Sequence, residues 1–145
     1  MPIQSKLTTL LFRAVFVLST GALLVATHWP GLAVKSSFSR MDLVIHACVF
    51  CCWTVLLGLT GWIRVPRCPK RRALVLVMIG IAFGLFDETT QPLFSRVFDP
   101  LDLAADSLGA IVGGVTMLIV WTRSSRSNQG GTPDSLARQA PDTRS

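Results

Sequence analysis

Residues whose side chains could carry chemistry are concentrated in the segment LFDETTQPLFSRVFDPLDLAADSLG, residues 85–109, which contains five carboxylates and one arginine. In this segment Asp106 follows Asp102 by four positions, and elsewhere His46 follows Asp42 by four positions. Residues at this spacing share one face of an α-helix. Carboxylates and an imidazole arranged in this way could exchange protons as general acids and bases, pair with one another, or bind a ligand.

The composition places these polar residues in a membrane protein. Half of the 145 residues are hydrophobic, 15% are charged, and the mean hydropathy is +0.52. Long apolar stretches predict an all-α, polytopic fold in which one domain, residues 1–122, forms four transmembrane helices. The predicted spans cover about residues 7–27, 40–63, 69–91 and 100–122. The last residues, 123–145, are polar and basic, which predicts a disordered cytoplasmic tail.

The distribution of Lys and Arg predicts the orientation of the spans. The segment RVPRCPKRR, residues 64–72, contains five basic residues, and the tail after Trp121 contains four. Cytoplasmic loops of membrane proteins are enriched in Lys and Arg, so this loop and both termini are predicted to be cytoplasmic. The other two loops, with most of the acids, then face outward.

Glu88 and Asp106 lie too deep in the predicted spans to reach water easily. The apolar runs 73–86 and 108–121 are each fourteen residues long, or about 21 Å as a helix, so each span must extend over its acid. A carboxylate near the centre of a span costs about 2.5–3.5 kcal/mol, and less near the ends. His46 is expected at a similar depth, so three spans bring ionisable groups to one level.

Acids closer to the helix ends have a simpler explanation. Ser39 and Asp42 have the spacing of a capping box, and Asp99-Pro100 followed by Asp102 is a strong helix start. An acid in a first turn satisfies free N–H groups and complements the helix dipole. Capping is therefore one interpretation of these three acids.

The deeper residues allow two interpretations. The nearest candidate partners of Glu88 are Gln91, three positions later, and Arg96. In the first interpretation, Glu88 pairs with Arg96 and Asp106 pairs with His46, and the network fixes how the helices pack. In the second, the same groups form an outward-facing site for a ligand, a metal or a substrate head group. A carboxylate set with a single imidazole matches no specific metal motif, so we assign no metal ligand and leave the cofactor unknown.

Small residues recur at the spacing of helix-packing motifs. Gly80 and Gly84 form one such pair, and Gly109 and Gly113 form another. These positions predict close helix packing, either within one bundle or between two copies in a homo-oligomer. The basic residues are not interleaved with aromatic ones, so the expected partner is the lipid bilayer and not nucleic acid.

Three motifs carry a resemblance to a known family: THWP at residues 27–30, DLVIH at 42–46, and ETTQPxxxRxxDPLDLAADSLGAxxG from Glu88 to Gly113. Together they resemble the VanZ-like membrane proteins. The resemblance implies a bacterial inner-membrane protein of the cell envelope, and the family's founding member is associated with low-level resistance to the glycopeptide teicoplanin. Matched by motif, the residues that the resemblance assigns to a binding site are Asp42, His46, Glu88, Gln91, Arg96, Asp102 and Asp106.

The chain departs from the family pattern at two positions: Leu43 stands where the family typically has Lys, and Asp106 where it often has Asn. The first predicted function is that of a protein whose outward polar cluster binds or modifies envelope precursors, or influences glycopeptide sensitivity. The alternative is a membrane enzyme acting on a phosphorylated or lipid-linked head group. In that enzyme Arg96 would hold a phosphate, and the catalytic candidates are His46, Glu88 and Asp106.

Overall fold

A computed structural model describes residues 3–29, 41–63 and 68–127. The described chain is entirely helical, and no strand occurs in these residues. The elements are α1 (Ile3–His28), α2 (Met41–Leu59), α3 (Pro69–Thr90), the short 3-10 helix η1 (Gln91–Phe94) and α4 (Pro100–Ser127). Four of these helices are long and apolar enough to cross a membrane, which confirms the predicted all-α, four-span fold.

Two predictions fall partly on residues outside the described ranges. Ser39, the first residue of the predicted capping box, is one of them. Of the predicted tail, residues 128–145 also lie outside, whereas α4 continues as a helix to Ser127.

Prolines set two helix starts and one helix end. Pro69 and Pro100 are the first residues of α3 and α4, where a missing backbone N–H costs nothing. Before Pro100, Asp99 caps α4, because its Oδ1 accepts a hydrogen bond of 2.8 Å from the backbone N–H of Leu101. Pro92 follows the end of α3, and the chain tightens into η1 before Ser95 leaves it in the left-handed region at φ 61°.

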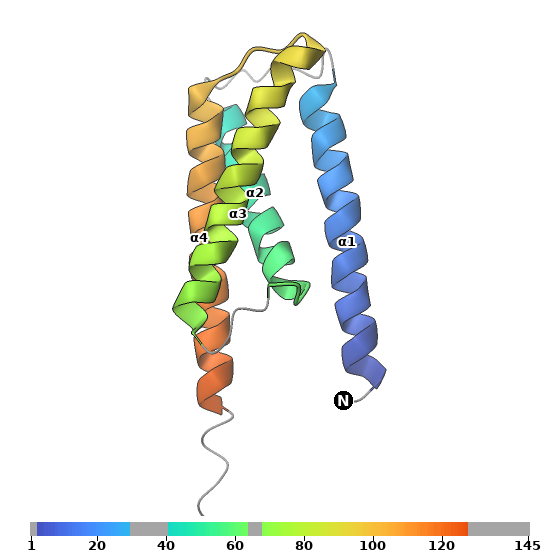
Figure 1. Ribbon diagram of the computed structural model, residues 1–145, viewed down its shortest axis with the longest axis vertical. Coiled ribbons are helices and arrows are strands. Elements are labelled where there is room, and N and C mark those ends of the chain that lie inside the picture. Colours follow the sequence, from blue (N-terminus) through green and yellow to red (C-terminus); the bar gives the residue numbers. More distant parts are fainter. Residues whose placement is uncertain (1–2, 30–40, 64–67, 128–145) are drawn as a thin grey trace, which may run out of the picture.

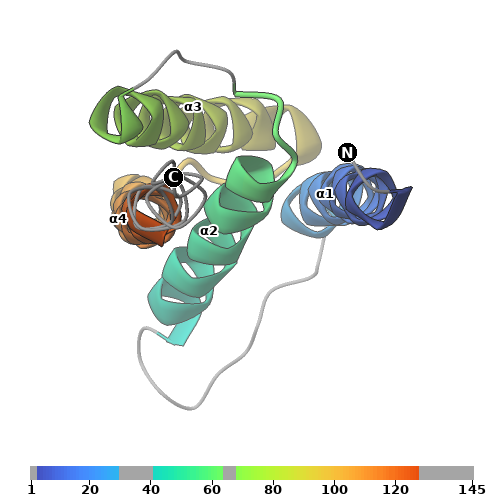
Figure 2. The same ribbon diagram turned by 90° about the horizontal axis from the view of Figure 1, so that it is seen from below.

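The helices pack as an unequal bundle (Figures 1 and 2). Helix α4 packs against both α2 and α3, whereas α1 lies on the other side of α2 and also touches η1. An aromatic contact between Phe16 and Trp53, with ring centroids 5.1 Å apart, joins α1 to α2. Trp53 in turn stacks on Phe83 of α3 at 4.5 Å, so one tryptophan connects three helices.

Glycines allow α4 to approach its neighbours closely. A Cβ on Gly109 would collide with the backbone oxygen of Ala47, and one on Gly113 would lie 2.7 Å from the backbone oxygen of Cys51. On α3, a Cβ on Gly80 would lie 2.7 Å from the Cβ of Ala110. Gly84 is packed similarly against the side chains of Asp106 and Phe50. All four glycines therefore serve packing within one chain, and a role in joining two copies stays a prediction.

The two ends of the bundle differ in chemistry. The end of α1, the start of α2, η1 and the start of α4 lie together at the upper end in Figure 1, which we call the polar end. The start of α1 and the end of α4 lie at the opposite end, near the basic start of α3. An even number of spans thus brings the start of α1 and the end of α4 to the same end. The side of the membrane that each end faces stays a prediction from the charge distribution.

Candidate functional site

A histidine–carboxylate pair lies between α2 and α4 near the polar end. The Nδ1 atom of His46 lies 2.9 Å from Oδ1 of Asp106, which confirms the pairing predicted from the sequence. The Asp106 side chain is completely buried. Gly84 of α3 contributes to this burial, since it leaves room for the Asp106 side chain beside the helix backbone.

Two more carboxylates approach the other side of the same imidazole. Oδ2 of Asp102, one turn before Asp106 on α4, lies 3.7 Å from the Nε2 atom of His46. Glu88 of α3 is fully buried beside them. Ligand atoms of His46, Glu88 and Asp102 all lie within 4.8 Å of one another. With Asp106, these residues form what we call the acid cluster, to which α2, α3 and α4 all contribute.

Glu88 is held by one predicted partner, Gln91, and by one that was not predicted, the backbone of Asp99. Its Oε1 accepts a hydrogen bond of 2.7 Å from Nε2 of Gln91, and its Oε2 accepts one of 3.2 Å from the backbone N–H of Asp99. Arg96, the other predicted partner, makes no ion pair with Glu88 in the described part of the chain. The turn after η1 brings the backbone of Asp99 to the carboxylate, so a neutral donor takes the place of the expected cation.

Some oxygen atoms of the acid cluster are buried without any partner. Neither Oδ1 of Asp102 nor Oδ2 of Asp106 has a hydrogen-bond donor within reach. Buried polar atoms in native proteins are almost always hydrogen-bonded, and each exception calls for an explanation. No Lys or Arg side chain among the described residues pairs with these acids. The cluster thus presents acceptors and negative charge, and it suits a ligand that donates hydrogen bonds or carries positive charge.

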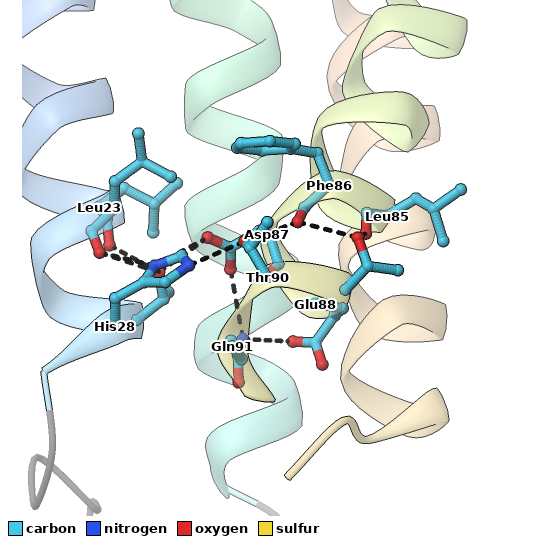
Figure 3. Close-up of polar contacts among 11 residues, drawn as sticks. Leu23, His28, Leu85, Phe86, Asp87, Glu88, Thr90 and Gln91 are labelled. Atoms are coloured by element: carbon cyan, nitrogen blue, oxygen red, sulfur yellow. Dashed lines mark hydrogen bonds and ion pairs between the residues drawn. The ribbon is translucent and has the colours of Figure 1, made fainter. Parts of the chain in front are cut away.

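A second polar network, which the sequence reasoning did not include in the site, joins α1 to α3 (Figure 3). Asp87 is completely buried and accepts a hydrogen bond of 2.8 Å from the hydroxyl of Thr27 through Oδ1. The Nδ1 atom of His28 lies 3.7 Å from the same oxygen, and its Nε2 lies 2.8 Å from the hydroxyl of Thr90. Gln91 links the networks, because its side-chain amide lies 3.4 Å from Asp87 and 2.7 Å from Glu88.

Sequence signals for this second network existed. Thr27 and His28 belong to the THWP motif, and Asp87 directly precedes Glu88 in the acidic segment. In the sequence the motif indicates a family, and the depth of the acids singles out Glu88 and not Asp87. A buried acid and a histidine at the ends of two spans would have been enough to suggest a pair.

Other predicted site residues lie at the margin of the acid cluster. Asp42 is exposed at the start of α2, and its Oδ1 accepts a hydrogen bond of 3.0 Å from the backbone N–H of Leu43. Arg96 is half-buried in the loop before α4. Of the seven predicted residues, the structure brings together His46, Glu88, Gln91, Asp102 and Asp106.

An open apolar groove of about 570 Å³ lies beside the second network, between α1 and the segment formed by the end of α3 and η1. Its polar side chains are those of His28 and Thr90, which hydrogen-bond to each other. The apolar residues that line the groove are Leu24, Val25, Trp29, Phe86, Leu93 and Phe94.

The fold and the site together define a class: a multi-pass helical membrane protein with a buried histidine–carboxylate cluster near one end of its bundle. Within that class, residues 32–121 match the model of the VanZ/LLP1 family, and the chain belongs to this family. The resemblance found in the sequence motifs is thereby confirmed. No curated protein and no solved structure matches the chain.

Proposed function

We propose that this VanZ-family protein resides in the bacterial inner membrane, with its polar end outward, and binds a lipid-linked molecule of the cell envelope. The hydrocarbon chain of the ligand lies in the groove between α1 and α3, and its head group lies at the polar end. Sequestering or presenting such a molecule is the route by which the protein would influence sensitivity to a glycopeptide such as teicoplanin.

The observation that carries this proposal is the continuity between the groove and the buried acids. His28 and Thr90 line the groove, and His28 lies against Asp87. Gln91 then connects Asp87 to Glu88 of the acid cluster. An apolar surface followed directly by fixed polar groups is what an amphiphile requires, since binding sites combine apolar walls with a few orienting polar atoms.

The charge of the site limits the kind of head group. Glu88, Asp102 and Asp106 offer acceptor atoms, and no cationic side chain among the described residues pairs with them. A bare phosphate would be repelled at this point, because like charges within a few ångströms disfavour one another strongly in a poorly solvated site. Hydroxyl, amide and amine groups of a sugar or peptide fit the acceptors, and a phosphate would need a bridging cation.

One arrangement favours the enzymatic alternative. His46 is oriented by Asp106, with its Nε2 atom directed toward Asp102, as a general base is oriented by a buried carboxylate. A reaction at a lipid-linked head group would use this imidazole for proton transfer. Binding is the function proposed first because it requires only the groove and the polar network.

The lipid proposal can be tested by closing the groove without touching the acids. Val25 lines the groove, and Val17 is a matched control on the same helix that does not line it. Their exposed fractions are 59% and 57%. Wild type, Val25→Trp and Val17→Trp are purified in mild detergent, mixed with a polyprenyl diphosphate that carries a sugar–peptide head group or with phosphatidylglycerol, and examined by native mass spectrometry.

We expect the wild type and Val17→Trp to retain lipid, and Val25→Trp to retain about tenfold less, the loss expected for about 1.4 kcal/mol of binding energy. Preference for the polyprenyl lipid would identify a wall-precursor carrier, whereas preference for the phospholipid would identify a bilayer lipid head group. Equal retention by the two variants would contradict the proposal. The same variants, expressed in a susceptible host, show whether teicoplanin sensitivity follows occupancy of the groove.

A further inference from the structure

We propose that the acid cluster is a binding site for a divalent transition-metal ion. The ligands are Nε2 of His46 and the carboxylates of Glu88 and Asp102, one from each of α2, α3 and α4. Their donor atoms already lie within 4.8 Å of one another. A metal with bonds of about 2.0–2.2 Å holds its ligand atoms roughly 3–4 Å apart, so small rotations of side chains complete the site.

Asp106 gives His46 the form that binds a metal. In the metal-bound site an ionised Asp106 would only accept hydrogen bonds, so the contact of 2.9 Å would place the proton on Nδ1 of the imidazole. A neutral imidazole protonated at Nδ1 presents the lone pair of Nε2 toward Asp102 and Glu88. A carboxylate behind a ligating histidine is a recurrent feature of metal sites, where it fixes the tautomer and the ring orientation. Asp106 is therefore a positioning residue, and its burial keeps it in place.

An unpartnered atom provides independent support. Oδ1 of Asp102 is buried without a donor, and it belongs to a carboxylate that would bind the ion. A buried acceptor without a partner destabilises the fold. A cation beside Asp102 supplies the missing partner and offsets the charge of the neighbouring carboxylates.

Glu88 is held in position before any ion binds. Gln91 and the backbone of Asp99 each donate one hydrogen bond to its carboxylate. Each carboxylate oxygen has two lone pairs, so the remaining ones stay available to a metal. Such a preorganised ligand loses little conformational freedom on binding.

The donor set selects among cations. One imidazole and two carboxylates fit Zn²⁺ or Mn²⁺, whereas Mg²⁺ and Ca²⁺ prefer sites made entirely of oxygen. Three protein ligands leave further coordination positions for water or for an oxygen atom of a bound molecule. The three ligands come from three separate helices, which explains why no spaced metal motif is visible in the sequence. The metal proposal does not depend on a lipid in the groove, and the two can fail separately.

The test uses the full chain with its four cysteines replaced by alanine, which removes adventitious thiolate ligands. The protein is treated with EDTA, freed of chelator in mild detergent, and titrated calorimetrically with ZnCl₂ and with MgCl₂. Binding of Mn²⁺ is measured separately from the loss of the free-ion electron paramagnetic resonance signal. The variants are Glu88→Gln, Asp102→Asn and Asp106→Asn. Asp134→Asn, which removes an acid that is not assigned to the binding site, is the charge control.

We expect about one equivalent of Zn²⁺ or Mn²⁺ to bind to the wild-type protein and to Asp134→Asn. Loss of a ligand in Glu88→Gln or Asp102→Asn lowers the affinity at least 100-fold, and loss of the positioning residue in Asp106→Asn lowers it about 10- to 100-fold. Binding also raises the midpoint of thermal unfolding, and this shift disappears in the ligand variants. Circular dichroism checks that each variant is folded. If Glu88→Gln does not fold, Asp102→Asn tests the proposal in its place.

Three results would overturn the proposal: no binding of either transition metal at millimolar concentration, equal binding of Mg²⁺, or unchanged affinity in the folded Asp102→Asn variant.

Discussion

Two histidine–aspartate pairs lie at the same end of the bundle. They differ in whether every oxygen of the carboxylate has a hydrogen-bond donor. Asp87, paired with His28, has a partner for each oxygen, Thr27 on one and Gln91 on the other. Asp106, paired with His46, has an oxygen that is buried without a donor. Both carboxylates are completely buried, so the difference does not come from access to water.

The comparison separates structural polar groups from functional ones. A buried network stabilises a protein when every member is satisfied, as in the pair that joins α1 to α3. A buried acceptor that lacks a donor reduces stability, and such costs concentrate at functional sites. We therefore expect the Asp87 network to hold α1 to the bundle and the acid cluster to bind a ligand.

The largest effect is expected when the satisfied pair is broken. Asp87→Ala leaves the hydroxyl of Thr27 and the amide of Gln91 without one acceptor each and removes the carboxylate beside His28. We expect the free energy of unfolding to fall by about 3–5 kcal/mol, the range for loss of one partner in a buried pair. Unfolding is measured by titrating SDS into mild-detergent micelles and following tryptophan fluorescence.

Asp102→Asn is the matched contrast in the acid cluster. Asp102→Asn removes a negative charge beside Glu88 and Asp106. In the absence of metal, we therefore expect its free energy of unfolding to lie within about 1 kcal/mol of the wild-type value or above it. A larger loss in Asp102→Asn than in Asp87→Ala would reverse the assignment of the two networks.

A smaller effect is expected from separating the helices that form the acid cluster. In Gly109→Ala the new methyl group collides with the backbone of Ala47 and pushes α4 away from α2. We expect a loss of about 1–3 kcal/mol, typical of overpacking, and a weaker contact between His46 and Asp106. The proton resonances of the His46 ring report that contact directly.

Gly21→Ala provides the control, since a Cβ at this position of α1 meets nothing within 4 Å. It should leave stability unchanged or raise it slightly, because alanine favours a helix over glycine. If both variants lost a similar amount of unfolding free energy, Gly109 would not be needed for the close approach of α2 and α4.

The spans could be predicted because long apolar runs predict a membrane helix. The pairing of His46 with Asp106 could be predicted because both lie about one turn inside their spans, at the same end of the bundle. Gln91, three positions after Glu88, could be predicted as its partner, but the backbone of Asp99 could not. The chain reaches Asp99 through a turn in which Ser95 adopts a left-handed conformation at φ 61°, and nothing in the sequence signals that conformation for a serine.

Asp87 was missed for a geometric reason. Successive residues on a helix point about 100° apart, so Asp87 and its neighbour Glu88 face different helices. Asp87 faces α1, where Thr27 and His28 lie, and Glu88 faces the start of α4, where Asp99 lies. One acidic dipeptide thus contributes to both networks, and only the packing of α1 reveals the second.

The smallest expected effect is a change in the labelling of a thiol at the end of the bundle opposite to both networks. This labelling also tests which side of the membrane the two networks face. Cys68 directly precedes α3, where the backbone N–H of Arg71, which hydrogen-bonds the sulfur, holds the pKa of the thiol below its usual range. Because the thiolate is the reactive form, labelling by a membrane-impermeant maleimide should reach half its maximal rate at a lower pH than for an ordinary thiol. Cys48 and Cys52 lie within α2, so Cys68→Ser identifies the labelled site.

If the basic end is cytoplasmic, Cys68 is labelled in inverted membrane vesicles and protected in intact spheroplasts. Labelling in spheroplasts would instead place both networks on the cytoplasmic side. That outcome would remove the outward-facing lipid from the proposed function and leave the contrast between the satisfied and unsatisfied networks intact, because the contrast depends on hydrogen bonds within the bundle and not on orientation.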